Sequence, residues 1–330
     1  MRCCVDVRAI AACCASVAML FSAPGALADE GGVAFWLSGQ FSSFAAVPAT
    51  PGWSLTALPY YYSGSAGGSK SFPKGNSVAT SIKSDAALLI VQPGYAPETK
   101  VLGGQPYLGL GFGYGRNSTQ AGLSISALGA KADQSDTVSG WLDLYPQASL
   151  AWNRGVHNWM TYLTGDIPVG TYDSQRLANL GLGHGAIDAG GGYTYLDPQT
   201  GREFSAVAGF TYNWKNPDTN YKNGIDSHLD WAASQFLSAN WQVGAVGYVY
   251  YQLTNDSFPT DGVLGALRLQ ALGGFKSRIA AIGPQVGYMF DLGGRQAYFN
   301  LRAYWEFWAE HRIEGYSVFA TINIPLGGKK

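Results

Sequence analysis

The stretch QAYFNLRAYWEFWAE, from Gln296 to Glu310, alternates apolar and polar side chains along its whole length. Its odd-numbered positions, from Ala297 to Ala309, are apolar, and each even-numbered position carries a polar atom. Side chains of a β-strand point alternately to opposite faces, so this stretch predicts a strand with one apolar and one polar face. At about 3.3 Å per residue it can cross a bilayer at a tilt of about 45°, whereas strands of soluble sandwiches usually have about 5–6 residues.

The same alternation recurs along the chain, and the connections between the alternating segments follow a regular order. From residue 105 onward, short turns such as DPQTG (197–201) alternate strictly with long loops such as KNPDTNYKNG (215–224). Hairpins with tight turns at one end and long loops at the other are typical of outer-membrane barrels. The pattern therefore predicts a series of antiparallel strands.

The predicted number of strands depends on how the first third of the chain is divided. From Ser84 the count is 12, with RNST (116–119) as a short turn and GAKADQSDTVSG (129–140) as a polar loop. Segments near Phe35 and Trp53 would raise the count to 14. Either number is even, as expected for a barrel with both termini on the periplasmic side.

The N-terminal residues have the pattern of a secretory signal. Arg2 and Arg8 precede an apolar run from Ala9 to Phe21, and Ala26-Leu27-Ala28 is a small-residue cleavage site. We therefore expect residues 1–28 to be removed. All four cysteines lie in this segment, so the mature chain would have no thiol for a disulfide, a catalytic nucleophile or a zinc–thiolate site.

The charge of the mature chain excludes one class of partner and suggests another. Removal of Arg2, Arg8 and Asp6 from the 21 basic and 22 acidic residues leaves a net charge of −2, so nucleic acid is not indicated. Only 13% of residues are charged, against about 25% in typical soluble domains, and 14% are aromatic. Such a chain either buries an unusual share of its surface or faces lipid.

Periodicity alone does not say which face of each strand points outward. Three features favour lipid: the apolar sets are long, the opposite faces are small or hydrophilic, and most tryptophans, such as Trp141, Trp214 and Trp241, lie near segment ends. An open sheet in hydrocarbon would leave unpaired edges. We therefore predict an all-β protein, a transmembrane antiparallel β-barrel in the outer membrane of a Gram-negative bacterium; a secreted β-sandwich or lipocalin-like barrel is the alternative.

This fold divides the chain into three parts. The signal peptide comprises residues 1–28 and the barrel comprises residues 53–330. Residues 29–52 break the alternating pattern, so we expect them to form an N-terminal lead-in or a plug folded into the lumen.

Several long phrases resemble one known family. They are GGVAFWLSGQFSSFAAVP (31–48), the run from GDIPVGTY to DWAASQF (165–236), KSRIAAIGPQVGYMF (276–290) and AYWEFWAEHRIEGYSVFATINIPL (303–326). Together they are similar to the MetA-pathway of phenol degradation family, also called SphA-type outer-membrane transporters. The resemblance implies a barrel encoded beside catabolic genes that admits aromatic or other apolar compounds, and it supplies no catalytic residues. The chain departs from most membrane barrels in not ending on an aromatic residue, the signal that the outer-membrane assembly machinery reads.

Charges on the polar face of the strands would cost little in a water-filled lumen and much in lipid. With the aromatic hydroxyls of that face, they form our candidates for the lumen or substrate path. These candidates are Asp143, Tyr145, Tyr162, Asp166, Asp188, His228, Asp230, Tyr248, Tyr298, Arg302, Tyr304 and Glu306. We expect no catalytic residue, metal or cofactor among them.

Three functions remain open. The first is a channel for passive uptake of small apolar or aromatic solutes, linked to their catabolism, with outer-membrane lipid, the solute and the assembly machinery as partners. The second is a structural or adhesion barrel with a closed lumen. The third is a lumenal hydrolase that uses His228 and Asp230, which stand two apart on one face, although no nucleophile-elbow sequence is present.

Overall fold

The structure is a computed structural model, and it describes residues 35–66, 72–74, 77–79, 81–125, 130–257 and 276–327. The expected signal peptide lies outside the described residues. Regular structure in the described parts consists of strands. No helix there is long and apolar enough to cross a membrane.

The strands are long, and most of them follow one another as neighbours in the sheet. They are β1 (Gly52–Ala66), β2 (Phe72–Lys74), β3 (Ser77–Ala79), β4 (Ser81–Ala96), β5 (Gln105–Ile125), β6 (Ala130–Trp141), β7 (Tyr145–Arg154), β8 (His157–Asp166), β9 (Ala186–Asp197), β10 (Arg202–Asn213), β11 (Asp226–Phe236), β12 (Trp241–Gln252), β13 (Arg278–Asp291), β14 (Gln296–Glu310) and β15 (Glu314–Pro325).

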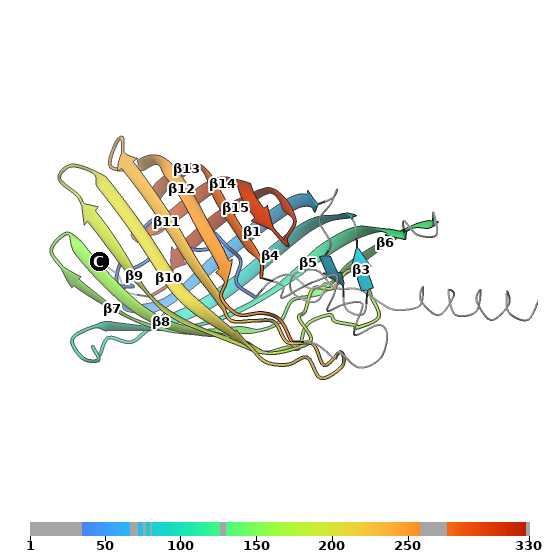
Figure 1. Ribbon diagram of the computed structural model, residues 1–330. Coiled ribbons are helices and arrows are strands. Elements are labelled where there is room, and N and C mark those ends of the chain that lie inside the picture. Colours follow the sequence, from blue (N-terminus) through green and yellow to red (C-terminus); the bar gives the residue numbers. More distant parts are fainter. Residues whose placement is uncertain are drawn as a thin grey trace, which may run out of the picture.

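These strands close into a barrel (Figure 1). β1 pairs with both β15 and β4, and the additional pairing of β4 with β5 completes the ring. The ring contains 12 antiparallel strands, and β6 is an extra strand of the same 13-stranded sheet. The predicted transmembrane antiparallel β-barrel is confirmed as a fold, with 12 strands rather than 14.

The predicted division of the first third of the chain is wrong. RNST (116–119) is not a turn, because β5 runs without interruption from Gln105 to Ile125. The stretch 129–140 is not a loop, because most of it forms β6. The predicted count of 12 is nevertheless the observed number, because two errors cancel. The count from Ser84 omits β1, and it treats β5 as two strands. The polar β6 lacks an apolar face because it pairs with β5 beyond the ring, where neither of its faces needs to be apolar.

β6 and β7 follow one another along the same edge of β5. β6 pairs with residues 114–125 of β5, and β7 pairs with residues 105–111. Residues 142–144 separate them, so the two strands form one path with a break. Leu142 keeps a backbone hydrogen bond of 2.8 Å to the carbonyl of Gly113 across this break.

The connections differ between the two ends of the barrel. The turns after β7, β9, β11 and β13 are short and lie at one end, the turn end, together with the end of β15. The other end, the loop end, has the long connections after β8, β10 and β12. The predicted strict alternation fails at β5 and β6, as described above, and also at β14 and β15, which are joined at the loop end by residues 311–313 alone.

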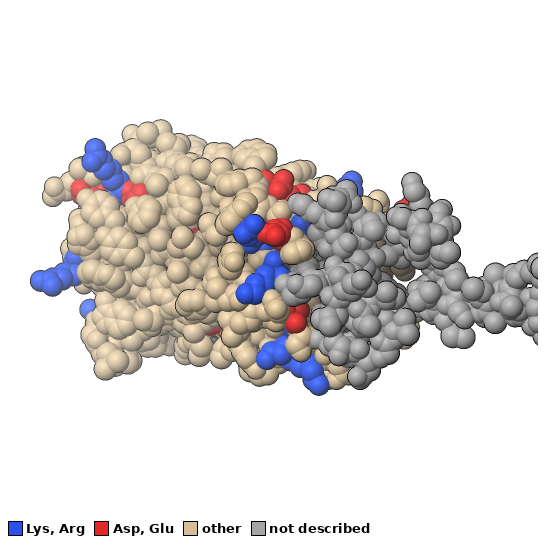
Figure 2. Space-filling model, in the orientation of Figure 1, with Lys and Arg blue, Asp and Glu red and all other residues tan. Residues whose placement is uncertain are grey.

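The apolar face of the strands points outward. On β10, Phe204 and Phe210 are 42% and 60% exposed, whereas Glu203 and Thr211 on the opposite face are each 3% exposed. A soluble barrel would bury the apolar set instead. On the face shown in Figure 2, acidic and basic side chains gather toward the two ends of the barrel, and the band between them is almost free of charge. This arrangement fits a hydrocarbon environment around the middle of the barrel.

Exposed aromatic side chains lie at both margins of this band. Trp53 and Trp241 begin their strands at the turn end, and they are 58% and 51% exposed. Trp141 and Trp214 lie at the loop end, with exposures of 61% and 47%. Rings with one polar atom are favoured at lipid–water boundaries, so these residues mark where the bilayer would begin and end.

We expect the outer face of β10 to reject a charge near its middle. Ala208→Arg should lower the free energy of unfolding by about 2–4 kcal/mol, the cost of an arginine at the bilayer midplane. Urea titration in phospholipid vesicles measures this change. Gln199→Arg, in the exposed turn between β9 and β10, is the control and should change stability by less than about 0.5 kcal/mol. Equal effects of the two substitutions would contradict a lipid-facing β10.

Candidate functional site

Residues 35–51, here called the inner segment, form no strand and contact the inward-facing side chains of the barrel. Asp230 on β11 accepts hydrogen bonds from the backbone N–H groups of Gly39 (3.0 Å) and Phe41 (3.2 Å). Arg302 on β14 donates to the carbonyls of Gly39 (3.1 Å) and Gln40 (2.9 Å). Two opposite charges of the wall thus bind the backbone of residues 39–41.

These hydrogen bonds pair backbone groups of the inner segment that would otherwise be buried without a partner. Such a segment cannot pair its own N–H and C=O groups, and leaving them unpaired would cost several kcal/mol. Residue 39 must also be glycine, because its φ is +85° and a Cβ there would lie 2.7 Å from the ring of Tyr304. The Tyr304 hydroxyl in turn donates to the carbonyl of Gly39 at 3.0 Å.

The second half of the inner segment is bound by residues that the sequence reasoning did not select. Glu203 on β10 accepts hydrogen bonds from the Ser43 hydroxyl (2.8 Å) and the Phe44 N–H (3.2 Å). Thr194 on β9 accepts one from the Ala46 N–H at 3.0 Å. Glu203 could have been found, because it alternates with Phe204 and therefore shares the polar face of its strand.

His228 pairs with Asp188 on β9, not with Asp230. The distance from His228 Nε2 to Asp188 Oδ2 is 3.0 Å, and Tyr162 donates to the other oxygen of Asp188 at 2.7 Å. Trp36 of the inner segment stacks on the imidazole with a centroid separation of 3.5 Å. The hydrogen-bond partners of His228 in the described residues are Asp188 and Tyr162, so no serine there completes a hydrolase triad with it.

The other tyrosine and glutamate candidates also make contacts inside the barrel. Glu306 accepts hydrogen bonds from Tyr248 at 2.6 Å and from Tyr62 at 2.9 Å. Tyr298 donates to the side chain of Gln242 at 2.7 Å. These bonds join β1, β12 and β14 within the lumen, on the side opposite the lipid-facing surface.

Asp143 lies in the break between β6 and β7, not within a strand as predicted. Its carboxylate accepts hydrogen bonds from the N–H groups of Gly170 (2.6 Å) and Leu182 (2.8 Å), both in the loop of residues 167–185. Nearby Asp166 is 5% exposed, and neither of its carboxylate oxygens has a hydrogen-bond partner among the described residues. Tyr145 begins β7 and packs at 6.2 Å from the ring of Phe35. No group of three metal-ligating side chains occurs in the described parts of the chain.

A cavity of about 1100 Å³ lies between the inner segment and the barrel wall, where β1, β4, β5, β7, β8, β14 and β15 each contribute two or more lining residues. It extends to the turns after β9 and β11, so it reaches the turn end. On β1 and β4 the lining changes from apolar toward the loop end (Leu58 and Leu88) to polar toward the turn end (Ser54 and Gln92). Apolar residues of the turns after β9 and β11, such as Pro198 and Leu237, also line the cavity at the turn end. None of the described residues that line it carries a charged side chain.

The cavity separates the twelve candidates into two groups. The structure places all of them in the barrel interior, buried or half-buried. Only Tyr145 and Tyr298 of these twelve line the cavity, and the other ten are not among its lining residues. Sequence reasoning therefore found residues that hold the interior together, and it missed most of those that face the open space.

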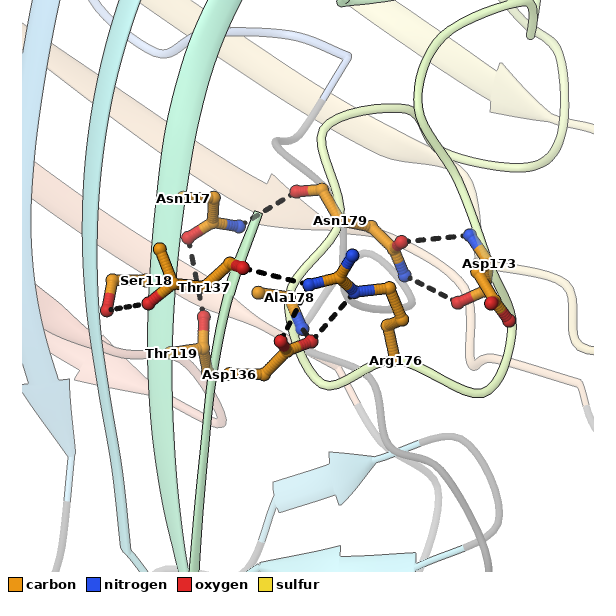
Figure 3. Close-up of polar contacts among 9 residues, drawn as sticks. All are labelled: Asn117, Ser118, Thr119, Asp136, Thr137, Asp173, Arg176, Ala178 and Asn179. Carbon is orange, nitrogen blue, oxygen red and sulfur yellow. Dashed lines mark hydrogen bonds and ion pairs between the residues drawn. The ribbon is translucent and has the colours of Figure 1, made fainter. Parts of the chain in front are cut away.

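The loop of residues 167–185 is fastened to β6 at the loop end (Figure 3). Arg176 donates two hydrogen bonds to Asp136 (3.0 and 2.7 Å) and one to the carbonyl of Thr137 on β6 (2.8 Å). Asn117 of β5 donates to the carbonyl of Asn179 at 2.8 Å. The loop thereby occupies the edge of β6 that faces away from β5.

We expect this fastening to depend on the charge of Asp136. The hydrogen bond from Arg176 holds the pKa of Asp136 below its ordinary value of 3.8, so the fastening is complete above that pH and is lost as the pH falls through the lowered pKa. The carboxylate of Asp136 also accepts a hydrogen bond from the N–H of Ala178. Asp136→Asn should accelerate hydrogen exchange at this N–H by about threefold, because exposed ion pairs contribute about 0.2–1 kcal/mol to stability. Asp133→Asn on the same strand is the control, and equal exchange in both variants would contradict the assignment.

Comparisons with known proteins agree with this architecture. The sequence profile of the family described as MetA-pathway of phenol degradation matches residues 67–322. An outer membrane channel from Pseudomonas putida F1 is 11% identical and superposes with a TM-score of 0.66 over 86% of this chain and 99% of that chain. This likeness shows the fold of an outer-membrane barrel.

Two further structures are more distant. A Pseudomonas aeruginosa FadL homologue is 8% identical, with a TM-score of 0.45 over 93% of this chain and 100% of that chain. The CymD monoaromatic hydrocarbon channel is 10% identical, with a TM-score of 0.39 over 91% of this chain and 96% of that chain. These scores are too low to support an argument about this chain. No curated protein matches the sequence.

Proposed function

The chain belongs to the MetA-pathway of phenol degradation family, and we propose that it is a passive channel through which small apolar or aromatic solutes cross the outer membrane. The observation that carries the proposal is the cavity of about 1100 Å³ inside a barrel whose outer surface is apolar. Ligand sites for drug-sized molecules have volumes of about 300–1,000 Å³, so the cavity has room for such solutes. Catabolism of the solute inside the cell would maintain the gradient that drives uptake.

The polarity of the cavity supports transfer toward the turn end. An apolar solute gains most from contact with Leu58, Leu88 and Leu142, where the wall is apolar. Closer to the turn end, the wall presents hydroxyl and amide groups that water can also bind. A solute moving in that direction exchanges apolar contact for water gradually, without a single large barrier.

In this proposal the inner segment is a plug that narrows the lumen. Next to the cavity, Leu37, which lines it, packs with Tyr248, Tyr304 and Phe319 in a buried cluster. The wall holds the backbone of residues 39–41 through four hydrogen bonds to Asp230 and Arg302. Movement of the segment would therefore decide how wide the path is.

Weakening this attachment should widen the channel. The double variant Asp230→Asn with Arg302→Met removes both charges together, so neither is left buried without its counterpart. Hydrogen bonds to charged groups contribute about 1.5–3 kcal/mol each, and their loss should raise single-channel conductance in planar bilayers. The exposed pair Asp218→Asn with Lys215→Met is the charge-matched control. An unchanged conductance in a folded double variant would contradict a plug held by these charges.

Filling the cavity should slow uptake. Ser149 on β7 lines the cavity, so Ser149→Trp should reduce uptake of a scarce labelled aromatic solute by intact cells. Leu163→Trp places the same side chain on the outer face of β8, where the residue is 49% exposed, and should leave uptake at the wild-type rate. Equal uptake in the Ser149 variant and the wild type would contradict the proposed path.

A closed structural barrel is the second candidate, and one observation favours it. The cluster of Leu37, Tyr248, Tyr304 and Phe319 fills part of the interior at the edge of the cavity. A barrel sealed there would give no channel events in a planar bilayer, whereas the proposed channel would.

A further inference from the structure

The middle of the cavity wall contains a small polar site made by three strands. Gln92 on β4 donates from Nε2 to Gln147 Oε1 on β7 at 2.7 Å, and the hydroxyl of Tyr107 on β5 is 3.4 Å from the same nitrogen. All three residues line the cavity. We infer that this site binds the hydroxyl group of a neutral solute whose apolar body lies in the apolar part of the cavity; the inference rests on the proposed channel function.

The two amides leave one donor and one acceptor for such a solute. When the nitrogen of Gln92 donates to the oxygen of Gln147, the oxygen of Gln92 and the nitrogen of Gln147 remain. Exchanging O and N in both amides reverses the bond and again leaves one oxygen and one nitrogen. A hydroxyl group both donates and accepts, so it can use both free groups, whereas a hydrocarbon can use neither.

The backbone around this site is shaped to admit its side chains. A Cβ at Gly109 of β5 would lie 2.4 Å from Gln92 Nε2. A Cβ at Gly94 of β4 would lie 2.1 Å from the hydroxyl oxygen of Tyr107. Gly94 and Gly109 are paired across the two strands, so the pair of glycines provides the space in which the amides and the phenol ring meet.

The rest of the cavity determines what else the solute can carry. Phe35, Leu37, Leu58, Leu88, Ile90 and Leu142 line the part toward the loop end, and they can pack only against an apolar body. None of the described lining residues is charged, so a carboxylate or an ammonium group would be buried there without a counter-charge. Burial of an unpaired ion is far more costly than burial of a hydroxyl that is hydrogen-bonded. The cavity therefore selects neutral solutes.

Three one-ring probes test this inference: benzyl alcohol, toluene and benzoate. Binding is measured by saturation-transfer NMR on the full chain in lipid nanodiscs, with empty nanodiscs subtracted. Benzyl alcohol should bind about fivefold more tightly than toluene, the gain expected from about one net hydrogen bond, and benzoate should not bind detectably. The double variant Gln92→Met with Gln147→Met keeps the side-chain length and should bring the ratio of benzyl alcohol to toluene close to one without weakening toluene binding.

Gln134→Met, on the exposed part of β6, is the matched control and should keep the wild-type ratio. The inference is overturned if wild-type protein binds benzyl alcohol and toluene equally, if the double variant keeps the preference, or if benzoate binds as well as benzyl alcohol. In those cases a slower uptake in the Ser149→Trp variant would leave the channel proposal standing. If no probe binds and Ser149→Trp does not slow uptake, both proposals fail.

Discussion

Backbone hydrogen bonding in hydrocarbon is the constraint on which the whole structure depends. An unpaired N–H or C=O group in the bilayer core costs several kcal/mol, so the sheet must close, and the pairing of β4 with β5 closes it. The break at residues 142–144 is where this ladder is interrupted. Contacts with the loop that follows β8 take the place of strand pairing there. Leu144 forms a β-bridge with Ile167, and Asp143 accepts hydrogen bonds from two N–H groups of the loop.

The same constraint acts a second time inside the barrel. The inner segment is irregular, so its backbone must be bound by side chains of the wall, and charged groups form the strongest such bonds. Asp230, Arg302 and Glu203 perform this task from β11, β14 and β10. None of these three residues lines the cavity, whose described lining carries no charged side chain. The charged side chains that bind the inner segment and the open space of the cavity thus occupy different parts of the lumen.

This division explains how far the sequence could be interpreted. Strands with one face in lipid alternate strictly, so the strand predicted from Gln296 to Glu310 has the bounds of β14. β6 has no lipid face, and its polar sequence therefore resembles a loop. Charge on the polar faces led to Asp188, Asp230 and Arg302, which are buried in the structure. It did not lead to the cavity, because none of the described residues that line the cavity carries a charge.

The polar site in the cavity wall was beyond sequence reasoning for a different reason. Gln92 and Gln147 are 55 positions apart, and they meet only because β5 lies between their strands in a particular register. Nothing in either strand alone specifies that register. The resulting site would also bind its ligand with low affinity, because one donor and one acceptor can form only two hydrogen bonds with a hydroxyl group. In the proposed channel, weak binding is an advantage, because a solute that enters must also leave, and a charged or fully enclosed site would retain it.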